Sequence, residues 1–528
     1  MRYFVLLSGL AFAAARGHAA EISVGAGAAC TTHTIAAALA MAAVTPEVDT
    51  IRLANDQAYT GQTVFIDTSV TLIGGHAGCG DLAPAGTTPL VGNGAWATLG
   101  IAGSGISVRL ERLDISGGGA SGDFGRWGGL NVSGQALVAL ADVAIHDNRN
   151  RYGGGLQLAG NAIVELERNV DIHHNHATAG GGIHADRATL RVRPHGIAIH
   201  DNDAINGGGI ALYNGAQLSV GTSLDDPWTP VDGLLIAANH ADDTGGGVLV
   251  SGSGTSMLAD DTVVRDNSAA EGGGIYASNG GYAQLARFRD GPFRHCPNEL
   301  ECVRLSGNTA ERGGALSARD GGSAHLSEVI VRGNTAAGGS AFWMYGDASQ
   351  VRILSSLVVR NSCLDSAPSC ATIYTAGGAL RFEHSTFADN GGGNALIWGD
   401  GFQYAIVTDI KGYSSLVAGK PKIFDFFGAV PTVRYDCVLK DTGFAEFAAT
   451  RSAVLPLAFQ DPARGDYHLP AGSAAVDWCD GAPVSSQSPD MDGTPRGLDS
   501  AKADVFGPYD LGAYESNRIF ASGTEARR

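Results

Sequence analysis

The sequence has no long cluster of lysine and arginine and no apolar stretch long enough to cross a bilayer. Its 35 basic residues are outnumbered by 53 acidic ones, which gives a formal net charge of -18. This balance argues against nucleic acid and anionic membranes as partners. A membrane-spanning helix needs about 20 apolar residues, so we expect no transmembrane segment. We predict a monomer, and leave an extracellular glycan or a host or cell surface open as the partner.

Closely spaced cysteine pairs such as Cys-x-x-Cys are also absent, which argues against a metal cluster built from the 8 cysteines. The chain begins with Arg2, an apolar run and small residues up to Ala19, a pattern typical of a signal peptide. We therefore expect a secreted or surface-associated protein, in which disulfides form by default. Pairing sequence neighbours predicts Cys30–Cys79, Cys296–Cys302, Cys363–Cys370 and Cys437–Cys479.

Glycine, in contrast, is abundant, with 76 residues, and much of it belongs to a repeat. The pattern occurs as IHDNRNRYGGGL, IHHNHATAGGGI and IHDNDAINGGGI, with Asn148, Asn175 and Asn202 spaced by 27 residues. The position three before each asparagine is apolar, and the residues leading to it alternate between apolar and polar. This period of two predicts a strand with one buried face.

A unit of this length cannot bury its apolar face alone, so we expect the units to coil and stack. The predicted fold is all-β, a right-handed parallel β-helix. Stacked asparagine amides can hydrogen-bond along the rod because each amide both donates and accepts. The predicted structural ladder consists of Asn148, Asn175, Asn202, Asn239, Asn267, Asn308 and Asn334, and the pattern continues to Asn361 and Asn390.

The two ends of the chain depart from the repeat. An alanine-rich segment from Thr34 to Ala43 predicts a helix that caps the first coil, and an acidic segment after the repeats predicts a C-terminal closing segment. The predicted division is a signal peptide at 1–19, an N-terminal cap at 20–50, β-helix repeats at 51–455, a closing segment at 456–515 and a tail at 516–528.

The repeats resemble those of chlamydial polymorphic outer membrane proteins, which carry GGA(I/L) and FxxN tetrapeptides. Gly313–Leu316 and Gly377–Leu380 match the first, and Phe387–Asn390 matches the second. The closing segment is similar to that of exported β-helix proteins labelled choice-of-anchor Q, through AGSAAVD, DMDGTPR and DLGAYE. The chlamydial proteins are adhesins, so the resemblance implies a β-helix with a surface-binding role.

Histidine is concentrated in the first repeats, where seven of the 15 histidines lie between His146 and His200. His146, His173 and His200 share one register beside Asp147 and Asp201, so we expect them to stack on the outer surface. Imidazole and carboxylate ligands suit a divalent transition metal. A flat column presents its ligands in a line, whereas zinc needs them to converge, and repeat duplication alone would also copy a histidine.

A second candidate metal site lies in the closing segment. Asp490 and Asp492 resemble the start of a calcium loop, and Asp499, Asp504 and Asp510 offer further oxygen ligands. The spacing of an EF-hand is absent, so a solvated acidic turn is the competing interpretation. We predict no required cofactor, with calcium or a divalent transition metal as the open alternatives.

No catalytic set is evident. The polygalacturonase motifs NTD, GHG and RIK are missing, as are WIDH and RxPxxR of the pectate lyases. Asp260 and Asp261 are adjacent, and neighbouring strand residues face opposite sides; Arg265 and Arg332 have the pattern of surface residues. We therefore predict a non-catalytic, adhesin-like binding protein. A polysaccharide lyase or glycoside hydrolase acting in the β-helix groove, and a passive cell-envelope protein, are the alternatives.

Overall fold

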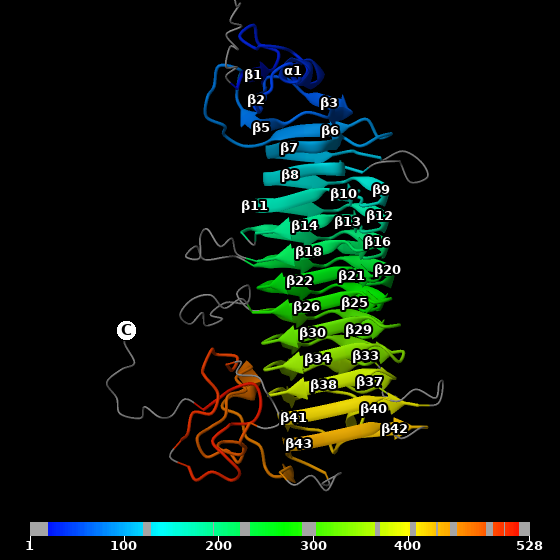
Figure 1. The fold of residues 1–528 in the computed structure, drawn as a ribbon, viewed down its shortest axis with the longest axis vertical. Helices are drawn as coiled ribbons and strands as arrows, with labels where there is room; N and C mark the ends of the chain where they lie inside the picture. The colour runs from blue at the N-terminus through cyan, green and yellow to red at the C-terminus, as the bar shows by residue number, and fades with distance from the viewer. Residues whose placement is uncertain are drawn as a thin grey trace, which may run out of the picture.

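The computed structural model describes residues 19–119, 128–193, 195–221, 233–287, 303–364, 370–401, 408–428, 431–443, 451–481, 489–500 and 502–516. Its strands pair in parallel and wind into a β-solenoid of about 14 turns. The N-terminal elements cover one end of the rod, and the C-terminal segment folds beside the other end (Figure 1). The predicted parallel β-helix is confirmed.

The N-terminal end contains the one α-helix of the described residues. Helix α1 (Ile35–Ala42) begins after Thr34, whose side chain accepts a hydrogen bond from the backbone N–H of Ala37, and it buries Ile35 and Leu39 against the first coils. The strands around it are β1 (Glu21–Val24), β2 (Asp49–Ala54), β3 (Tyr59–Gln62), β4 (Val64–Ile66), β5 (Val70–His76), β6 (Thr88–Gly92), β7 (Leu99–Ser116) and β8 (Leu130–His146).

The remaining coils each contribute short strands to four parallel stacks. The first stack contains β10 (Leu156–Ala159), β13 (Ile183–Asp186), β17 (Ile210–Tyr213), β21 (Val248–Ser251), β25 (Ile275–Ser278), β29 (Leu316–Arg319), β33 (Phe342–Tyr345), β37 (Ile373–Ala376), β40 (Ala395–Asp400) and β42 (Lys422–Phe427). The second contains β11 (Ile163–His173), β14 (Thr189–Val192), β18 (Gln217–Val220), β22 (Ser256–Asp260), β26 (Tyr282–Ala286), β30 (Ser323–Ser327), β34 (Gln350–Leu354), β38 (Ala379–Glu383), β41 (Asp409–Val417) and β43 (Thr432–Lys440).

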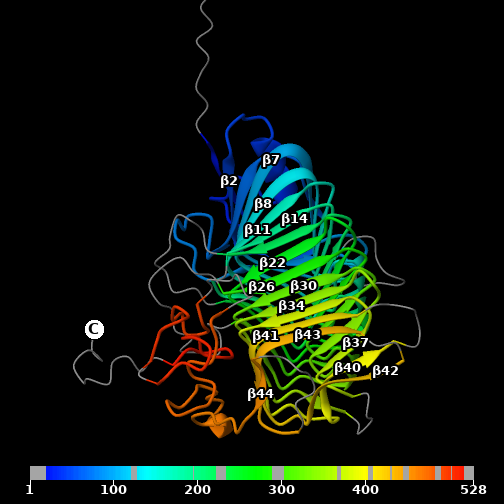
Figure 2. The same ribbon diagram turned by 60° about the horizontal axis from the view of Figure 1, so that its bottom comes forward.

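The third stack contains β15 (Ile197–His200), β19 (Leu234–Ala237), β23 (Thr262–Arg265), β27 (Arg304–Ser306), β31 (Ile330–Arg332), β35 (Leu357–Val359) and β39 (Thr386–Ala388). The fourth contains β9 (Arg149–Tyr152), β12 (His176–Ala179), β16 (Asp203–Asn206), β20 (His240–Thr244), β24 (Ser268–Glu271), β28 (Thr309–Arg312), β32 (Thr335–Gly338) and β36 (Ser362–Cys363). The first and second stacks lie side by side in both views (Figures 1 and 2).

The core of the rod is built by the alternation seen in the sequence. Val170 and Ile172 of β11 point inward and stack on the equivalent residues of the coils above and below, while the residues between them face out. The positions three before each repeat asparagine are fully buried: Ile145, Ile172, Ile199, Ile236, Val264, Leu305, Val331, Val358 and Phe387. Stacking therefore buries in every coil what a single coil would leave exposed.

The asparagines form a continuous buried ladder at the turn between the third and fourth stacks. The Nδ2 of Asn175 donates to Oδ1 of Asn202 at 3.0 Å and to the backbone oxygen of Ile145 at 2.9 Å, and the backbone N–H of Asn175 donates to the same Oδ1. Equivalent bonds join each member to the next, along Asn148, Asn175, Asn202, Asn239, Asn267, Asn308, Asn334, Asn361 and Asn390.

The Gly-Gly-Gly segments form the turn between the fourth and first stacks, and two of their positions need glycine for different reasons. Gly180 has a φ of 67°, a left-handed conformation that glycine adopts without strain. A Cβ on Gly181 would lie 2.5 Å from the backbone oxygen of Gly208 in the next coil. The first glycine therefore allows the turn, and the second allows the coils to approach each other.

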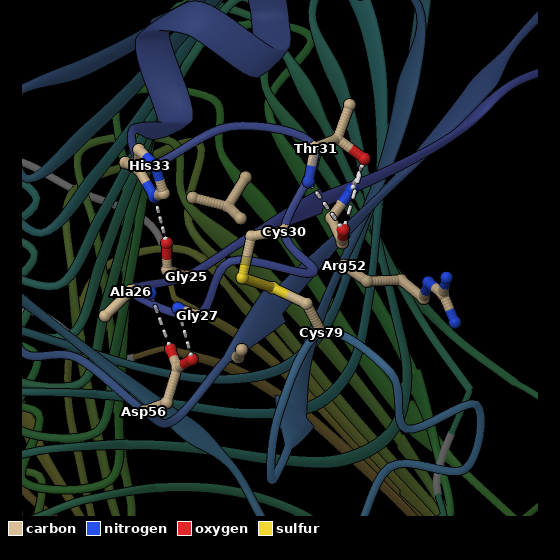
Figure 3. Close-up of a disulfide and its surroundings, with 12 residues drawn as sticks. Gly25, Ala26, Gly27, Cys30, Thr31, His33, Arg52, Asp56 and Cys79 are labelled. Atoms are coloured by element: carbon tan, nitrogen blue, oxygen red, sulfur yellow. Dashed lines mark hydrogen bonds between the residues drawn. A yellow bond between two sulfur atoms is a disulfide. The ribbon is translucent and has the colours of Figure 1, made fainter.

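Three of the four predicted disulfides are present, and the fourth pair, Cys296–Cys302, lies outside the described residues. Cys30–Cys79 ties the N-terminal cap to the loop after β5 (Figure 3), while the other two are Cys363–Cys370 and Cys437–Cys479. Cys437 belongs to β43, so this last bond fastens the closing segment to the end of the rod.

The closing segment folds back along the outer face of the third stack. Leu357 and Val359 of β35 contact Tyr467, Met491 and the neighbouring apolar residues of this segment, and its short elements are β44 (Ala453–Val454) and the 3₁₀ helix η1 (Pro462–Arg464). The predicted signal peptide except Ala19, and all of the predicted tail except Ser516, lie outside the described residues. No helix of the described residues has the length and apolar character needed to cross a membrane.

Candidate binding face

The predicted histidine column forms, with the three rings lying one above another on the outer surface of the third stack of strands. The rings of His146 and His173 are parallel to within 4° with centroids 5.0 Å apart, and those of His173 and His200 are 5.2 Å apart. His146 hydrogen-bonds Asp114 at 2.6 Å and Asp147 at 2.7 Å. Hydrogen bonding to Asp114 raises the pKa of His146 to about 9 despite partial burial.

Most nitrogens of this column already have partners. His200 pairs with Asp171 at 2.9 Å and with Asp201 at 2.6 Å, while Nδ1 of His173 contacts Nδ1 of His174 at 2.7 Å. Burial lowers the pKa of His173. The negative charge of Asp171 opposes this shift, and the neighbouring histidines add to it. Among the described residues, two groups of His, Cys, Asp or Glu have potential metal-ligand atoms that all lie within 4.8 Å of one another, and the histidine column is not one of them. A metal at this column stays a prediction.

The two aspartates predicted to bind calcium are used within the closing segment. Oδ1 of buried Asp490 accepts the backbone N–H groups of Asp492 and Thr494, and its Oδ2 accepts that of Glu515. Asp492 hydrogen-bonds His468 at 2.7 Å. This arrangement is that of a hydrogen-bonded turn, and calcium bound there stays a prediction.

The other acidic residues of this segment separate into two groups. Asp510 lies inside, where its oxygens accept the backbone N–H groups of Asp477 and Ser516. Asp499 and Asp504 are exposed, and one oxygen of each lies within 4.8 Å of an oxygen of buried Asp477. Asp477 itself is hydrogen-bonded to Ser500. Three carboxylates therefore meet here, of which the sequence analysis had grouped Asp499 and Asp504 but not Asp477.

A buried arginine explains why the closing segment is rich in charge. Arg496 is fully enclosed; its Nη2 donates to Ser355 Oγ at 3.1 Å, and its Nη1 lies 3.6 Å from Glu515. Burial, followed by the nearby Asp510, raises the pKa of Glu515 to about 8. The DMDGTPR and DLGAYE motifs therefore supply the polar core through which the segment docks on the third stack.

The structure also assembles a row of aromatic side chains that the sequence analysis missed. Trp343, Tyr374 and Trp398 occupy the same outward position of β33, β37 and β40, one coil apart. The rings of Trp343 and Tyr374 are parallel to within 3°, with centroids 3.7 Å apart. We call these three residues the aromatic row, and all three are partly exposed.

The fourth stack controls how much of this outward column is exposed. Farther up the rod, outward side chains of the two stacks meet across the glycine turn: Glu271 of β24 accepts a hydrogen bond from Ser317 of β29 at 2.7 Å. At β32, Gly338 leaves room for the Trp343 ring, which a Cβ there would approach to 2.7 Å. The fourth stack, as described, ends at β36, so the aromatic row lies where its cover stops.

A row of basic residues follows the second stack on the same coils. Arg352, Arg381, Lys411 and Arg434 occupy one register position of β34, β38, β41 and β43. We call these four residues the basic row. The first three line a groove of about 290 Å³ together with Tyr282 and other residues. The first and second stacks lie side by side (Figure 1), so the two rows run parallel to each other along neighbouring sheets.

Carboxylates beneath the basic row hold it in place. Glu383 is completely buried and pairs with both Arg352 and Arg381, while Lys411 Nζ lies 2.5 Å from Asp409. Burial and then repulsion from Arg352 lower the pKa of Arg381. The cations are therefore fixed in direction and close enough to repel one another.

The residues that sequence reasoning weighed for catalysis lie on earlier coils than the aromatic and basic rows. Asp260 ends β22, and Asp261 follows it in the turn with a φ of 43°. Burial, and then Asp261, raises the pKa of Asp260 to about 6. Arg265 and Arg332 are exposed on the third stack, where Arg265 pairs with Asp266.

Both rows were hidden in the sequence because their members belong to different coils. Arg352 and Arg381 each lie nine residues before a ladder asparagine, so counting back from the ladder would have aligned these two. Trp343 and Tyr374 lie 18 and 16 residues before the same two asparagines and would not have been aligned. No family model matches the chain, and no curated protein was found to be similar to it. The case for the candidate face therefore comes from the geometry of its residues alone.

Proposed function

We propose that this chain is an exported, adhesin-like β-solenoid that binds a glycan chain on the face formed by the aromatic and basic rows. The observation that carries the proposal is the aromatic row, three flat side chains aligned along the rod, all partly exposed and two of them stacked face to face. Aromatic rings that are apolar and rigid are strong contact residues in binding sites. A row along the rod suits an extended ligand.

The surroundings of the row support binding by contact. Arg312 lies over the Trp343 ring at 5.8 Å, and Tyr374 donates a hydrogen bond to Asp400 at 3.0 Å. These contacts hold the rings in place before a ligand arrives, which lowers the entropy lost on binding. A purely structural coat protein has no need of preorganised, exposed aromatic side chains.

Export and surface location form part of the same proposal. The three disulfides support an oxidising compartment, as does the signal-peptide pattern of the first 19 residues. The repeats resemble those of the chlamydial adhesins and the closing segment resembles that of choice-of-anchor Q proteins, which supports a role at a cell surface. Fold alone is weak support for function, so binding has to be measured.

The test is a binding screen with matched tryptophan variants. The mature chain is titrated with a panel of neutral and acidic polysaccharides, and binding is followed by calorimetry. We expect Trp343→Ala or Tyr374→Ala to weaken binding roughly tenfold, because one well-placed aromatic contact contributes about 1.4 kcal/mol. Trp96→Ala is the control, since Trp96 is 47% exposed but lies near the opposite end of the rod.

Three outcomes contradict the proposal. If no polysaccharide binds the wild-type chain, a passive envelope role is favoured. Equal losses in Trp343→Ala and Trp96→Ala would place binding elsewhere. Release of reducing ends or unsaturated products by the wild-type chain would favour the lyase or hydrolase alternative over simple binding.

A further inference from the structure

We infer that the basic row makes the binding face selective for acidic glycans, by pairing Arg352, Arg381, Lys411 and Arg434 with carboxylate or sulfate groups spaced along the ligand. This inference rests on the proposed function and names its ligand class. The net charge of -18 predicts repulsion of polyanions, but it averages over the whole molecule. Along the basic row, the local charge is positive although the net charge of the chain is negative.

The basic row is continuous along the axis of the rod. Its members are register partners in adjacent parallel strands, and neighbouring strands in a sheet lie roughly 4.8 Å apart. Directly above Arg352, the same position holds His325 and then Gln284, so donors continue where the positive charge ends. An extended polyanion lying parallel to the axis would meet a cation at each of four coils.

Positive charge exceeds negative charge along this row. Three of its four cations, Arg352, Arg381 and Lys411, contact two carboxylates, Glu383 and Asp409. The next carboxylate along β43, Asp436, is bonded to Arg451 of the closing segment. Glu383 has no exposed surface, whereas the side chains of Arg352 and Arg381 are 40% and 38% exposed. A ligand therefore meets guanidinium groups and not the carboxylate beneath them.

The groove contains polar atoms that the protein does not satisfy. Within the described chain, Arg352 Nε and His325 Nε2 are buried and have no hydrogen-bond partner. A buried polar group without a partner costs about 1–3 kcal/mol, and in native proteins it calls for a specific reason. These two atoms are therefore hydrogen-bonding groups in the wall of the groove that the described chain leaves unused.

Three coils carry a member of each row. The face therefore suits a ligand that has both sugar rings and acidic groups better than it suits a simple anion. Trp343 and Arg352 follow each other in one coil, as do Tyr374 with Arg381 and Trp398 with Lys411. A glycan chain can contact the exposed ring edges of the aromatic row while its anionic substituents meet the cations of the neighbouring sheet. Arginine suits this task, because its planar fork matches the two oxygens of a carboxylate.

The test compares charged glycans with neutral derivatives of the same backbone. The probes are polygalacturonate, hyaluronan and chondroitin sulfate, each paired with its carboxyl-reduced form. We expect carboxyl reduction of the first two to weaken binding roughly tenfold or more, since a charge-assisted hydrogen bond contributes about 1.5–3 kcal/mol. Reduced chondroitin sulfate keeps its sulfates, so its remaining affinity separates sulfate from carboxylate recognition.

The variants are Lys411→Gln and Arg434→Gln, which leave the buried Glu383 paired. Each should weaken binding of the acidic probes several-fold and reduce the dependence on sodium chloride, because exposed charges are screened by salt. Arg191→Gln is the matched control: Arg191 occupies the same register position of β14 but pairs with Glu165 at 3.0 Å. We expect no change from it.

The result separates this inference from the proposed function. If reduced and unreduced probes bind equally and Lys411→Gln has no effect, while Trp343→Ala still weakens binding, the face binds glycans without selecting acidic ones. If no probe binds at all, both ideas are wrong. Tighter binding of a single-stranded DNA oligonucleotide than of any polysaccharide would overturn the ligand class.

Discussion

Removing one rung from the middle of the asparagine ladder tests whether stacking of the amides stabilises the rod. Asn267 is fully buried, and its side chain makes four hydrogen bonds. Its Oδ1 accepts from the backbone N–H and from Nδ2 of Asn239, while its Nδ2 donates to the backbone oxygen of Ile236 and to Oδ1 of Asn308. Alanine at this position removes all four bonds.

The expected loss follows from the groups left without this partner. The backbone N–H of Asn239 and the backbone oxygen of Ile236 both lose the Asn267 amide inside the rod. At about 1–3 kcal/mol for each buried orphan, Asn267→Ala should lower the free energy of unfolding by roughly 2–6 kcal/mol. The backbone N–H of Asn267 still donates to Asn308, so that rung is only partly broken.

Urea unfolding followed by circular dichroism measures the loss, and hydrogen exchange locates it. Exchange should accelerate in β19 and β23, because coils contact only their neighbours. Asn394→Ala is the control, since Asn394 is exposed in the turn before β40. If Asn267→Ala costs no more than Asn394→Ala, the ladder does not stabilise the rod, and the reasoning fails.

Two further predictions concern backbone strain and pH. The residue before each ladder asparagine has a left-handed backbone, and Ala238 has a φ of 53°. Ala238→Gly should therefore stabilise the protein by about 0.5–1 kcal/mol. Gly333→Ala should destabilise it by a similar amount through backbone strain alone, because a Cβ on Gly333 meets no atom within 4 Å. Melting curves of the two variants should therefore shift in opposite directions. Burial and Asp261 raise the pKa of Asp260 from 3.8 to about 6, so the folded state binds this proton more tightly and loses stability as the pH rises through that window. Asp260→Asn should be about 1–2 kcal/mol more stable than the wild type at pH 7, after discounting for solvent, and no more stable below about pH 4, as measured by urea titration at each pH.

The scaffold could be predicted from the sequence because its determinants are local and repeated. Ile172, Asn175 and the glycines at 180–182 lie within a dozen residues of one another, and the same set recurs in later coils. Each copy reinforces the same interpretation: a buried strand, a ladder asparagine and a close turn. The disulfides that could be checked also joined sequence neighbours, which is the simplest pairing.

The binding face could not be predicted in this way because no single repeat contains it. Arg381 and Lys411 become neighbours only after the register of β38 and β41 is known. Insertions of different length lie between coils, so the spacing in sequence does not reveal the alignment. The docking of Arg496 beside Ser355 is equally invisible, since it joins the closing segment to a coil more than a hundred residues earlier.

The position of the face along the rod is itself informative. In the regular coils near the N-terminal end, the outward positions of the first stack are covered, as at His184 and Ala211, which are 5% and 0% exposed. In the later coils the repeat weakens: Ala315 and Ala341 replace the third glycine of the turn, and the fourth stack ends. Local departures from a consistent pattern tend to mark functional sites. Here the aromatic and basic rows begin where the repeat becomes irregular, so the coils that we propose as the binding site are those that follow the consensus least.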